Sequence, residues 1–256
     1  MFKEERQNEI MNLLNTEIYA TVQYLAHKLH TSPSSIRRDL TILEKKGFLK
    51  RSYGGVELVM ESHRYAPSFA VHKQKNIEKK RAIAKLAIEL IPNDSVVFLD
   101  GSSSSYYLAE LLAGRKNITV ISNNIDSVNV LAESNIDHIY STGGRVSKTN
   151  RAVLTGSFAE NMASSIHADF FFFSTLALSK NGIISDDSES ENKLRKIMFA
   201  NSDKRILLCD SKKLGHTSIF SFCNVSELDY LVCDEDISGY FDEDFKETAF
   251  IYPNEK

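Results

Sequence analysis

The chain of 256 residues has few cysteines and no long apolar run, and both features narrow its class. The three cysteines (Cys209, Cys223 and Cys233) lack CxxC spacing, which argues against a disulfide framework or a zinc site. Cys209 and Cys233 each end an apolar run, so we expect buried free thiols and a reducing cytoplasm. No stretch of about 18 apolar residues is present, so no transmembrane helix is expected. The start MFKEERQNEI is charged and lacks the apolar region of a secretory signal. We expect neither a metal nor a cofactor.

The net charge is also small. Thirty-one basic and 34 acidic residues leave −3, which argues against a generally basic coat for nucleic acid. The charge is unevenly distributed, however. Residues 20–56 contain seven basic and two acidic residues, a local +5, which leaves −8 on the other 219 residues. This local excess predicts either an ordinary solvated basic face or a surface for an acidic partner.

Two regions of the chain differ in their sequence patterns. Residues 1–58 predict three short helices and a hairpin. Residues 76–256 alternate apolar strand-like runs with amphipathic helices, which is typical of an α/β domain with a largely parallel sheet. Residues 59–75 have little periodicity and contain Pro67, so they are the expected linker.

The segment TSPSSIRRDLTILEKKG predicts a capped helix. Ser32 suits the N-cap and Pro33 the first helical position, and apolar residues recur on one face at Ile36, Leu40 and Leu43. The preceding helix, expected to begin at Thr21, ends only a few residues earlier. Two helices joined so tightly indicate a helix-turn-helix motif. FLKRSYGGVEL then predicts a small wing whose tip region carries Arg51 and Tyr53, within reach of phosphates or a minor groove.

In the second region, VVFLDGSSSSYYLAELL predicts a strand over 95–99, a loop over 100–105 and a helix over 106–112. A small-residue loop before a helix N-terminus suits an anion, but an ordinary serine-rich turn explains it as well. The sequence is neither a P-loop nor a GxSxG elbow. Further strand ends are also polar, and in open α/β sheets such ends form the ligand crevice. The candidate residues for one small anionic ligand are Ser103, Ser104, Asn123, Gly143, Gly144 and Lys213.

The segment SSIRRDLTILEKKGFLKRSYGG resembles the signature of the DeoR family of bacterial transcriptional regulators. Ser35 stands where that family usually has Thr, and Tyr53 where it usually has His. The resemblance implies a winged helix-turn-helix domain that binds double-stranded operator DNA. The residues that it places on the major groove or flanking phosphates are Ser34, Ser35, Arg37 and Arg38, with Arg51 and Tyr53 on the wing.

The rest of the chain, to about residue 235, is similar to the DeoR effector domain, whose fold resembles sugar-phosphate isomerases and glucosamine-6-phosphate deaminase. The family's D-x-G-[ST]-T pattern aligns from Asp100 to Ser104, and its D-x-S-K-F-G pattern places the lysine at Lys213. Its F-x-G-x-x-G pattern is altered here to Ser174 and Ala177. The resemblance implies a phosphorylated-sugar site with Ser102, Ser103, Ser104 and Lys213 on the phosphate, Asp100, Asn123 and Glu191 on hydroxyls, and Gly143 and Gly144 nearby.

We therefore expect a non-enzymatic repressor of a sugar-metabolism operon, acting as a homo-oligomer (dimer or tetramer) and controlled by a sugar phosphate. One alternative is a sugar-phosphate isomerase or deaminase with an added DNA-binding head, in which Asp100, Asp169, Glu191 or Asp210 would act as acid or base. Another is a protein-binding module that uses the wing surface.

Overall fold

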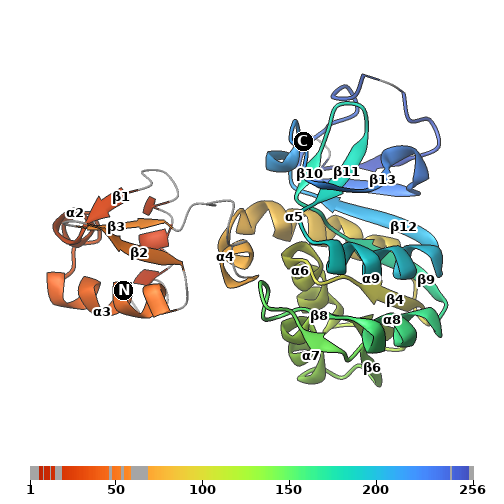
Figure 1. Cartoon of the computed structure of the whole chain (residues 1–256), viewed down its shortest axis with the longest axis horizontal. Coiled ribbons are helices and arrows are strands. Elements are labelled where there is room, and N and C mark those ends of the chain that lie inside the picture. The colour runs from red at the N-terminus through yellow and green to blue at the C-terminus, as the bar shows by residue number, and fades with distance from the viewer. Residues whose placement is uncertain are drawn as a thin grey trace. The chain divides into compact units, whose positions relative to one another are not determined.

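The computed structural model of the chain describes residues 6–7, 9–11, 13–14, 19–45, 48–52, 55–58, 69–242 and 244–253. The chain divides into two compact units, residues 1–75 (unit 1) and residues 76–256 (unit 2), drawn from red to blue along the sequence in Figure 1. None of the helices in these described ranges is both long enough and apolar enough to cross a membrane.

Unit 1 is a small helical unit with a three-stranded antiparallel sheet of order β1-β3-β2. The Thr21 hydroxyl accepts a hydrogen bond from the Tyr24 amide (3.1 Å) and so begins α2, as expected. The wing contains a third strand, β1, that the sequence pattern did not predict. The elements are β1 (Tyr19–Thr21), α2 (Val22–Lys28), α3 (Pro33–Lys45), β2 (Leu49–Ser52), β3 (Gly55–Leu58) and α4 (Phe69–Gln74).

Gly55 explains how β1 joins the wing. A Cβ atom at this position would lie 2.5 Å from the carbonyl oxygen of Ala20 and 2.8 Å from the ring of Tyr19, so only glycine lets β3 approach β1 this closely. Helix α4 falls within the range 59–75 that was expected to be a linker. Its Phe69 is buried, and six residues are too short a stretch to show a helical period. Residues 59–68 lie outside the described residues.

The core of unit 1 is apolar, and a buried carboxylate joins two of its helices. Residues 6, 7, 9–11, 13 and 14 are helical, in agreement with the first of the three short helices expected within residues 1–58. Asp39 of α3 is 1% exposed and accepts hydrogen bonds from Arg6 Nε (2.6 Å) and Gln7 Nε2 (3.1 Å). The buried apolar core of unit 1 includes Ile10, Leu14, Leu25, Ile36 and Leu40.

Unit 2 is built on a seven-stranded parallel sheet of order β15-β14-β12-β9-β4-β5-β6. Helices α5, α6 and α7 pack side by side, and α8 packs against α9 (Figure 1). The sheet strands are β4 (Val96–Leu99), β5 (Thr119–Ser122), β6 (His138–Ser141), β9 (Ala168–Phe173), β12 (Ser202–Cys209), β14 (Tyr230–Cys233) and β15 (Ala249–Ile251). The helices are α5 (Ile77–Ala87), α6 (Ser103–Leu112), α7 (Ile125–Ala132), α8 (Ser157–Ser164) and α9 (Glu189–Ala200), with 3-10 turns η1 (Ile88–Leu90), η2 (Ser211–Lys213) and η3 (Val225–Glu227).

Two smaller sheets complete unit 2. One is the hairpin β7 (Arg145–Val146) and β8 (Leu154–Thr155), and the other is an antiparallel sheet of β10 (Ala177–Leu178), β11 (Ile183–Asp186) and β13 (Phe220–Asn224). The latter lies near the C-terminal end in Figure 1. The core is rich in phenylalanine: the rings of Phe171 and Phe173 on β9 stack at 5.1 Å. The predicted α/β architecture with a parallel sheet is confirmed.

The strand order reverses between β4 and β9. From β4 the chain proceeds to β5 and β6 on one side, whereas β9, β12 and β14 follow on the other. In open parallel sheets, ligands bind beyond the carboxyl ends of the strands at such a switch point. Asp100 follows β4 and Ser174 follows β9. The topology therefore places these two residues at the edge of the sheet where ligands bind in this class of fold.

We expect Asp39→Ala to lower the free energy of unfolding of unit 1 by about 2–3 kcal/mol, because it leaves Arg6 and Gln7 without their shared acceptor. Urea unfolding of the full chain, with hydrogen exchange of the α3 amides reporting on unit 1, measures this change. The control is Glu44→Ala, which removes a surface ion pair with Arg51 and should cost less than about 1 kcal/mol. Equal losses in the two variants would contradict the role of Asp39.

Candidate functional site

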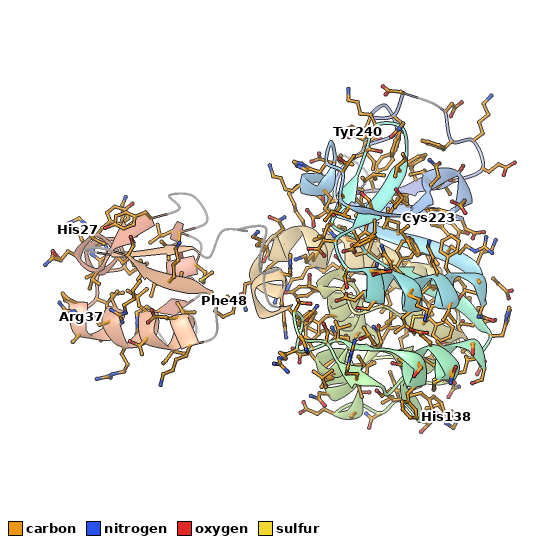
Figure 2. All side chains as sticks on the ribbon, in the orientation of Figure 1. His27, Arg37, Phe48, His138, Cys223 and Tyr240 are labelled. Atoms are coloured by element: carbon orange, nitrogen blue, oxygen red, sulfur yellow. The ribbon has the colours of Figure 1, made fainter. Side chains whose placement is uncertain are left out.

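Helix α3 presents a polar face opposite its buried one. Ser34, Arg37 and Arg38 are exposed and Ser35 is half-buried; Figure 2 shows Arg37 on this helix. The Ser32 hydroxyl accepts a hydrogen bond from the Ser35 amide (3.2 Å) and lies 2.9 Å from the hydroxyls of Ser34 and Ser35. The first turn is thus capped as expected, and the two arginines follow it on the solvent side.

Arg51 lies on β2 and folds back onto α3. Its Nε is 3.1 Å from Glu44 Oε2, and its Nη2 donates to the Thr41 hydroxyl at 2.9 Å. The guanidinium is thus held beside the polar face of α3. Tyr53, the other predicted wing residue, lies outside the described residues.

In unit 2, Asp100 binds the ends of several elements together. Its Oδ1 accepts from the Ser105 hydroxyl (2.6 Å) and the Ser102 amide (3.1 Å). Its Oδ2 accepts from the Ser174 amide (3.2 Å) and from Arg195 Nε (3.1 Å). A carboxylate has about four acceptor positions, and four protein donors occupy them here. Asp100 therefore shapes the loop after β4, and its geometry favours that role over direct contact with sugar hydroxyls.

Arg195 of α9 is the counter-ion of Asp100, and the sequence analysis missed it. It is 4% exposed and also faces Asp186 Oδ2 at 3.3 Å. Although burial alone would lower it, the carboxylates of Asp186, Asp100 and Glu191 raise the pKa of the Arg195 guanidinium above its ordinary value. Its guanidinium is also 5.6 Å from the centre of the Phe222 ring. The only sequence signal was its position one turn after Glu191.

A narrow pocket lies beside this ion pair. Its lining combines predicted and unpredicted residues: Asp100, Gly101, Asn123, Glu191, Leu194, Arg195 and Met198. Glu191 is partly buried there. Desolvation, reinforced by Asp186 and Asp100 and opposed by Arg195, raises the pKa of its carboxyl to about 7.

The loop after β4 is shorter than predicted, because α6 begins at Ser103 instead of Tyr106. The Ser102 hydroxyl accepts from the Ser105 amide at 3.2 Å and so caps the helix three residues earlier. Ser103 and Ser104 consequently lie buried in its first turn. The Ser104 hydroxyl and Asn123 Oδ1 are buried without a hydrogen-bond partner in the described part of the chain. Buried polar atoms of this kind are the ones that a ligand can satisfy.

Gly143 and Gly144 are not part of the pocket lining. Gly144 has φ +103°, and a Cβ there would lie 2.7 Å from the Thr155 carbonyl oxygen and 3.0 Å from Ala159. The position requires glycine so that the β7–β8 hairpin and α8 can pack closely. Gly143 has φ +63° and is exposed.

Lys213 reaches the switch point from η2. Its Nζ lies 2.6 Å from the Ser174 hydroxyl and 3.8 Å from Asp210 Oδ2. Ser174 in turn donates its backbone amide to Asp100, so one residue separates Lys213 from the loop that begins α6. The geometry thus brings Lys213, Ser174 and Asp100 together at the ends of β12, β9 and β4.

Comparison with known proteins assigns the two units to a family. The DeoR C terminal sensor domain matches residues 75–235, and the DeoR-like helix-turn-helix domain matches residues 6–62. The chain belongs to the DeoR family. The HTH-type transcriptional regulator GolR of Listeria innocua serovar 6a is 32% identical over 249 residues, which cover 97% of each chain. The family predicted from SSIRRDLTILEKKGFLKRSYGG is therefore confirmed.

Other DeoR relatives differ in their named roles. The L-fucose operon activator of Haemophilus influenzae is 32% identical over 91% of this chain and 92% of its own. The HTH-type transcriptional repressor GlcR of Bacillus subtilis is 30% identical over 91% of this chain and 89% of its own. Among solved structures, ribose 5-phosphate isomerase A from Methanocaldococcus jannaschii covers 55% of each chain at 15% identity and a TM-score of 0.42. The assignment to the DeoR family rests on the sequence matches.

We expect the pocket of this DeoR-family chain to make stability depend on pH through Glu191. Its pKa of about 7 in the folded state lies above the ordinary 4.5, so the folded protein holds this proton more tightly than the unfolded chain. The contribution of this proton to the free energy of unfolding is fully present below the pKa of the unfolded chain and is lost as the pH rises through about 7. The thermal unfolding midpoint should therefore decrease as the pH is raised from about 5 to about 8, and Glu191→Gln should make this decrease smaller.

The control for this pH series is Glu189→Gln, because Glu189 is exposed in the same first turn of α9. It should follow the wild-type curve. If Glu191→Gln also followed that curve, the titration of Glu191 in the pocket would be disproved.

Proposed function

We propose that this DeoR-family chain is a DNA-binding repressor of a sugar-metabolism operon and that a phosphorylated sugar bound in unit 2 controls it. The observation that carries this proposal is the match of the sensor domain to residues 75–235 together with the polar pocket at the sheet switch point. Relatives named as repressors support the direction of control, among them GlcR and the lactose phosphotransferase system repressor of Staphylococcus epidermidis. A reporter driven by the upstream region of the gene distinguishes repression from activation.

On the DNA side, α3 serves as the recognition helix. Arg37 and Arg38 contact phosphates or base edges, and Ser34 and Ser35 lie at the start of the helix, where such motifs reach the major groove. Arg51 and Tyr53 contribute from the wing. Two copies would read a repeated half-site, which implies a homo-oligomer, dimer or tetramer, whose size sedimentation measures.

On the effector side, the ligand phosphate binds at the N-terminus of α6, near Ser102, Ser103 and Ser104, and to the Lys213 ammonium. The helix dipole favours an anion there. Asn123 and Glu191 face the sugar, and Asn123 Oδ1 supplies an acceptor that lacks a partner in the described protein. Because the pocket is narrow, the effector selects an opened conformation and shifts the equilibrium by its differential affinity.

Catalysis by this pocket is not part of the proposal. Asp100 accepts four protein hydrogen bonds, which leaves it unsuited to act as a base. Incubation of the pure protein with pentose and hexose phosphates should yield no turnover, and detection of an isomerised or deaminated product would favour the enzyme alternative.

We expect Arg37→Ala and Arg38→Ala each to weaken binding to the DNA upstream of the gene. Each lost phosphate contact should reduce the slope of log K against log salt by about 0.9. Fluorescence anisotropy across a salt series measures both effects. Lys116→Ala is the control, because Lys116 is exposed on unit 2. An unchanged slope in both arginine variants would contradict the role of α3.

We expect Lys213→Ala to weaken sugar-phosphate binding at least tenfold, because about 1.4 kcal/mol of a charge-assisted contact is lost. Calorimetry with the sugar phosphate that gives the largest thermal shift in a screen measures this loss. The matched control is Lys212→Ala, since Lys212 precedes it in η2 but is exposed. Equal affinities of Lys213→Ala and wild type would remove Lys213 from the site.

A further inference from the structure

The turn by which the chain enters unit 2 is anchored to the same η2 turn that carries Lys213. Unit 2 begins at Asn76, whose Nδ2 donates to Asp210 Oδ1 at 3.1 Å. Asp210 is 2% exposed and also accepts from the Lys212 amide at 3.2 Å. Its other oxygen, Oδ2, faces the Lys213 ammonium at 3.8 Å. One buried carboxylate thus contacts both Asn76 and Lys213.

Asn76 has an unusual backbone conformation for a residue other than glycine. Its φ of 53° and ψ of 40° lie in the left-handed region, and its side chain does not cap α5. Instead, its amide group is directed to Asp210, while its carbonyl oxygen accepts from the Lys80 amide at 3.1 Å. The bond to Asp210 therefore helps to hold a conformation that the backbone alone disfavours.

A second contact ties the same turn to η2. Lys79, in the first turn of α5, donates to the Ser211 hydroxyl at 2.7 Å and pairs with Asp234. Ser211 also donates its amide to Asp234 Oδ1 at 2.7 Å. A displacement of η2 consequently moves acceptors that hold both Asn76 and Lys79.

We propose that Asp210 couples effector binding at Lys213 to the turn at Asn76 through which the chain enters unit 2. This inference rests on the proposed function, because it requires a phosphate to bind Lys213. The phosphate competes with Ser174 and Asp210 for the Lys213 ammonium, and the resulting shift of η2 changes the hold on Asn76. Residues 1–75 are joined to unit 2 through this turn, so its conformation changes with the occupancy of the pocket.

The test uses the full chain and the Asn76→Gly variant. Glycine accepts the left-handed conformation but removes the bond to Asp210. The matched control is Asn117→Gly, because Asn117 has φ 55° and precedes β5. For each protein, affinity for the DNA upstream of the gene is measured with and without the sugar phosphate that gives the largest thermal shift, and with inorganic phosphate as the anion alone.

We expect the DNA affinities of the wild-type chain without and with the sugar phosphate to differ by a factor of about 5–150, the usual range of coupling between two sites. Asn76→Gly should bind the DNA alone, and the sugar phosphate alone, with wild-type affinity. The ratio of its DNA affinities without and with the sugar phosphate should fall to within about twofold of one, which is loss of the coupling. Asn117→Gly should keep the wild-type ratio. A wild-type ratio in Asn76→Gly, or an equal loss in both variants, would overturn the role of Asp210 while the proposed function stands.

Absence of sugar-phosphate binding to the wild-type protein would overturn the proposed function and this inference with it. If Asn76→Gly did not fold, hydrogen exchange of the wild-type chain decides. Binding of the sugar phosphate should change the exchange rate of the Lys80 and Lys212 amides at least threefold and leave the amides of β5 unchanged. Unchanged rates at Lys80 and Lys212 would refute the coupling.

Discussion

The buried ion pair between Asp100 and Arg195 is the interaction on which the arrangement of unit 2 depends. It joins the end of β4, the start of α6, the end of β9 and the middle of α9 at one carboxylate. Such a pair adds little net stability over apolar packing, but loss of one partner costs about 3–5 kcal/mol because the other charge stays buried. The ion pair therefore fixes positions: the β4–α6 loop, the end of β9 and the middle of α9, three segments distant in sequence, are held in one geometry at the switch point.

This ion pair also sets the charge distribution around the pocket, whose lining includes neither the first turn of α6 nor Lys213. The positive charge of Arg195 is offset by Asp100 and Asp186, with Glu191 nearby, so an incoming phosphate gains little there. In the proposed effector site, the positive end of the α6 dipole and the Lys213 ammonium are the groups that favour an anion. The Glu191 side of the pocket instead suits hydrogen-bond donors. A ligand with an anionic end and a hydroxyl-bearing end fits this polarity in one orientation.

Much of this arrangement could be predicted from the sequence, and most of the failures involve contacts between segments distant in sequence. The cap of α3, its buried face and the parallel strands follow from local patterns, so they were predicted correctly. Strand β1 depends on the close approach that Gly55 allows, and the early start of α6 depends on Asp100 orienting a serine-rich loop. Arg195 resembled an ordinary charged residue of an amphipathic helix, because its partner is 95 residues away. Strand β1 and Arg195 thus depend on long-range contacts that no local pattern records, whereas α6 begins at a local cap, Ser102, that could not be distinguished within a run of four serines.

The existing contacts of Lys213 limit the free energy that a ligand can gain from its ammonium group. Its ammonium already has an intramolecular acceptor in Ser174 and a carboxylate in Asp210, so an effector gains only the difference between its own contact and these. The pocket beside Asp100 is narrow. In the proposed function, the effector binds a second arrangement of η2 and the pocket, and the shift it produces equals its differential affinity for the two arrangements. In the proposed effector site, the contacts that hold Lys213 lower the affinity for the effector and couple its binding to a change in η2.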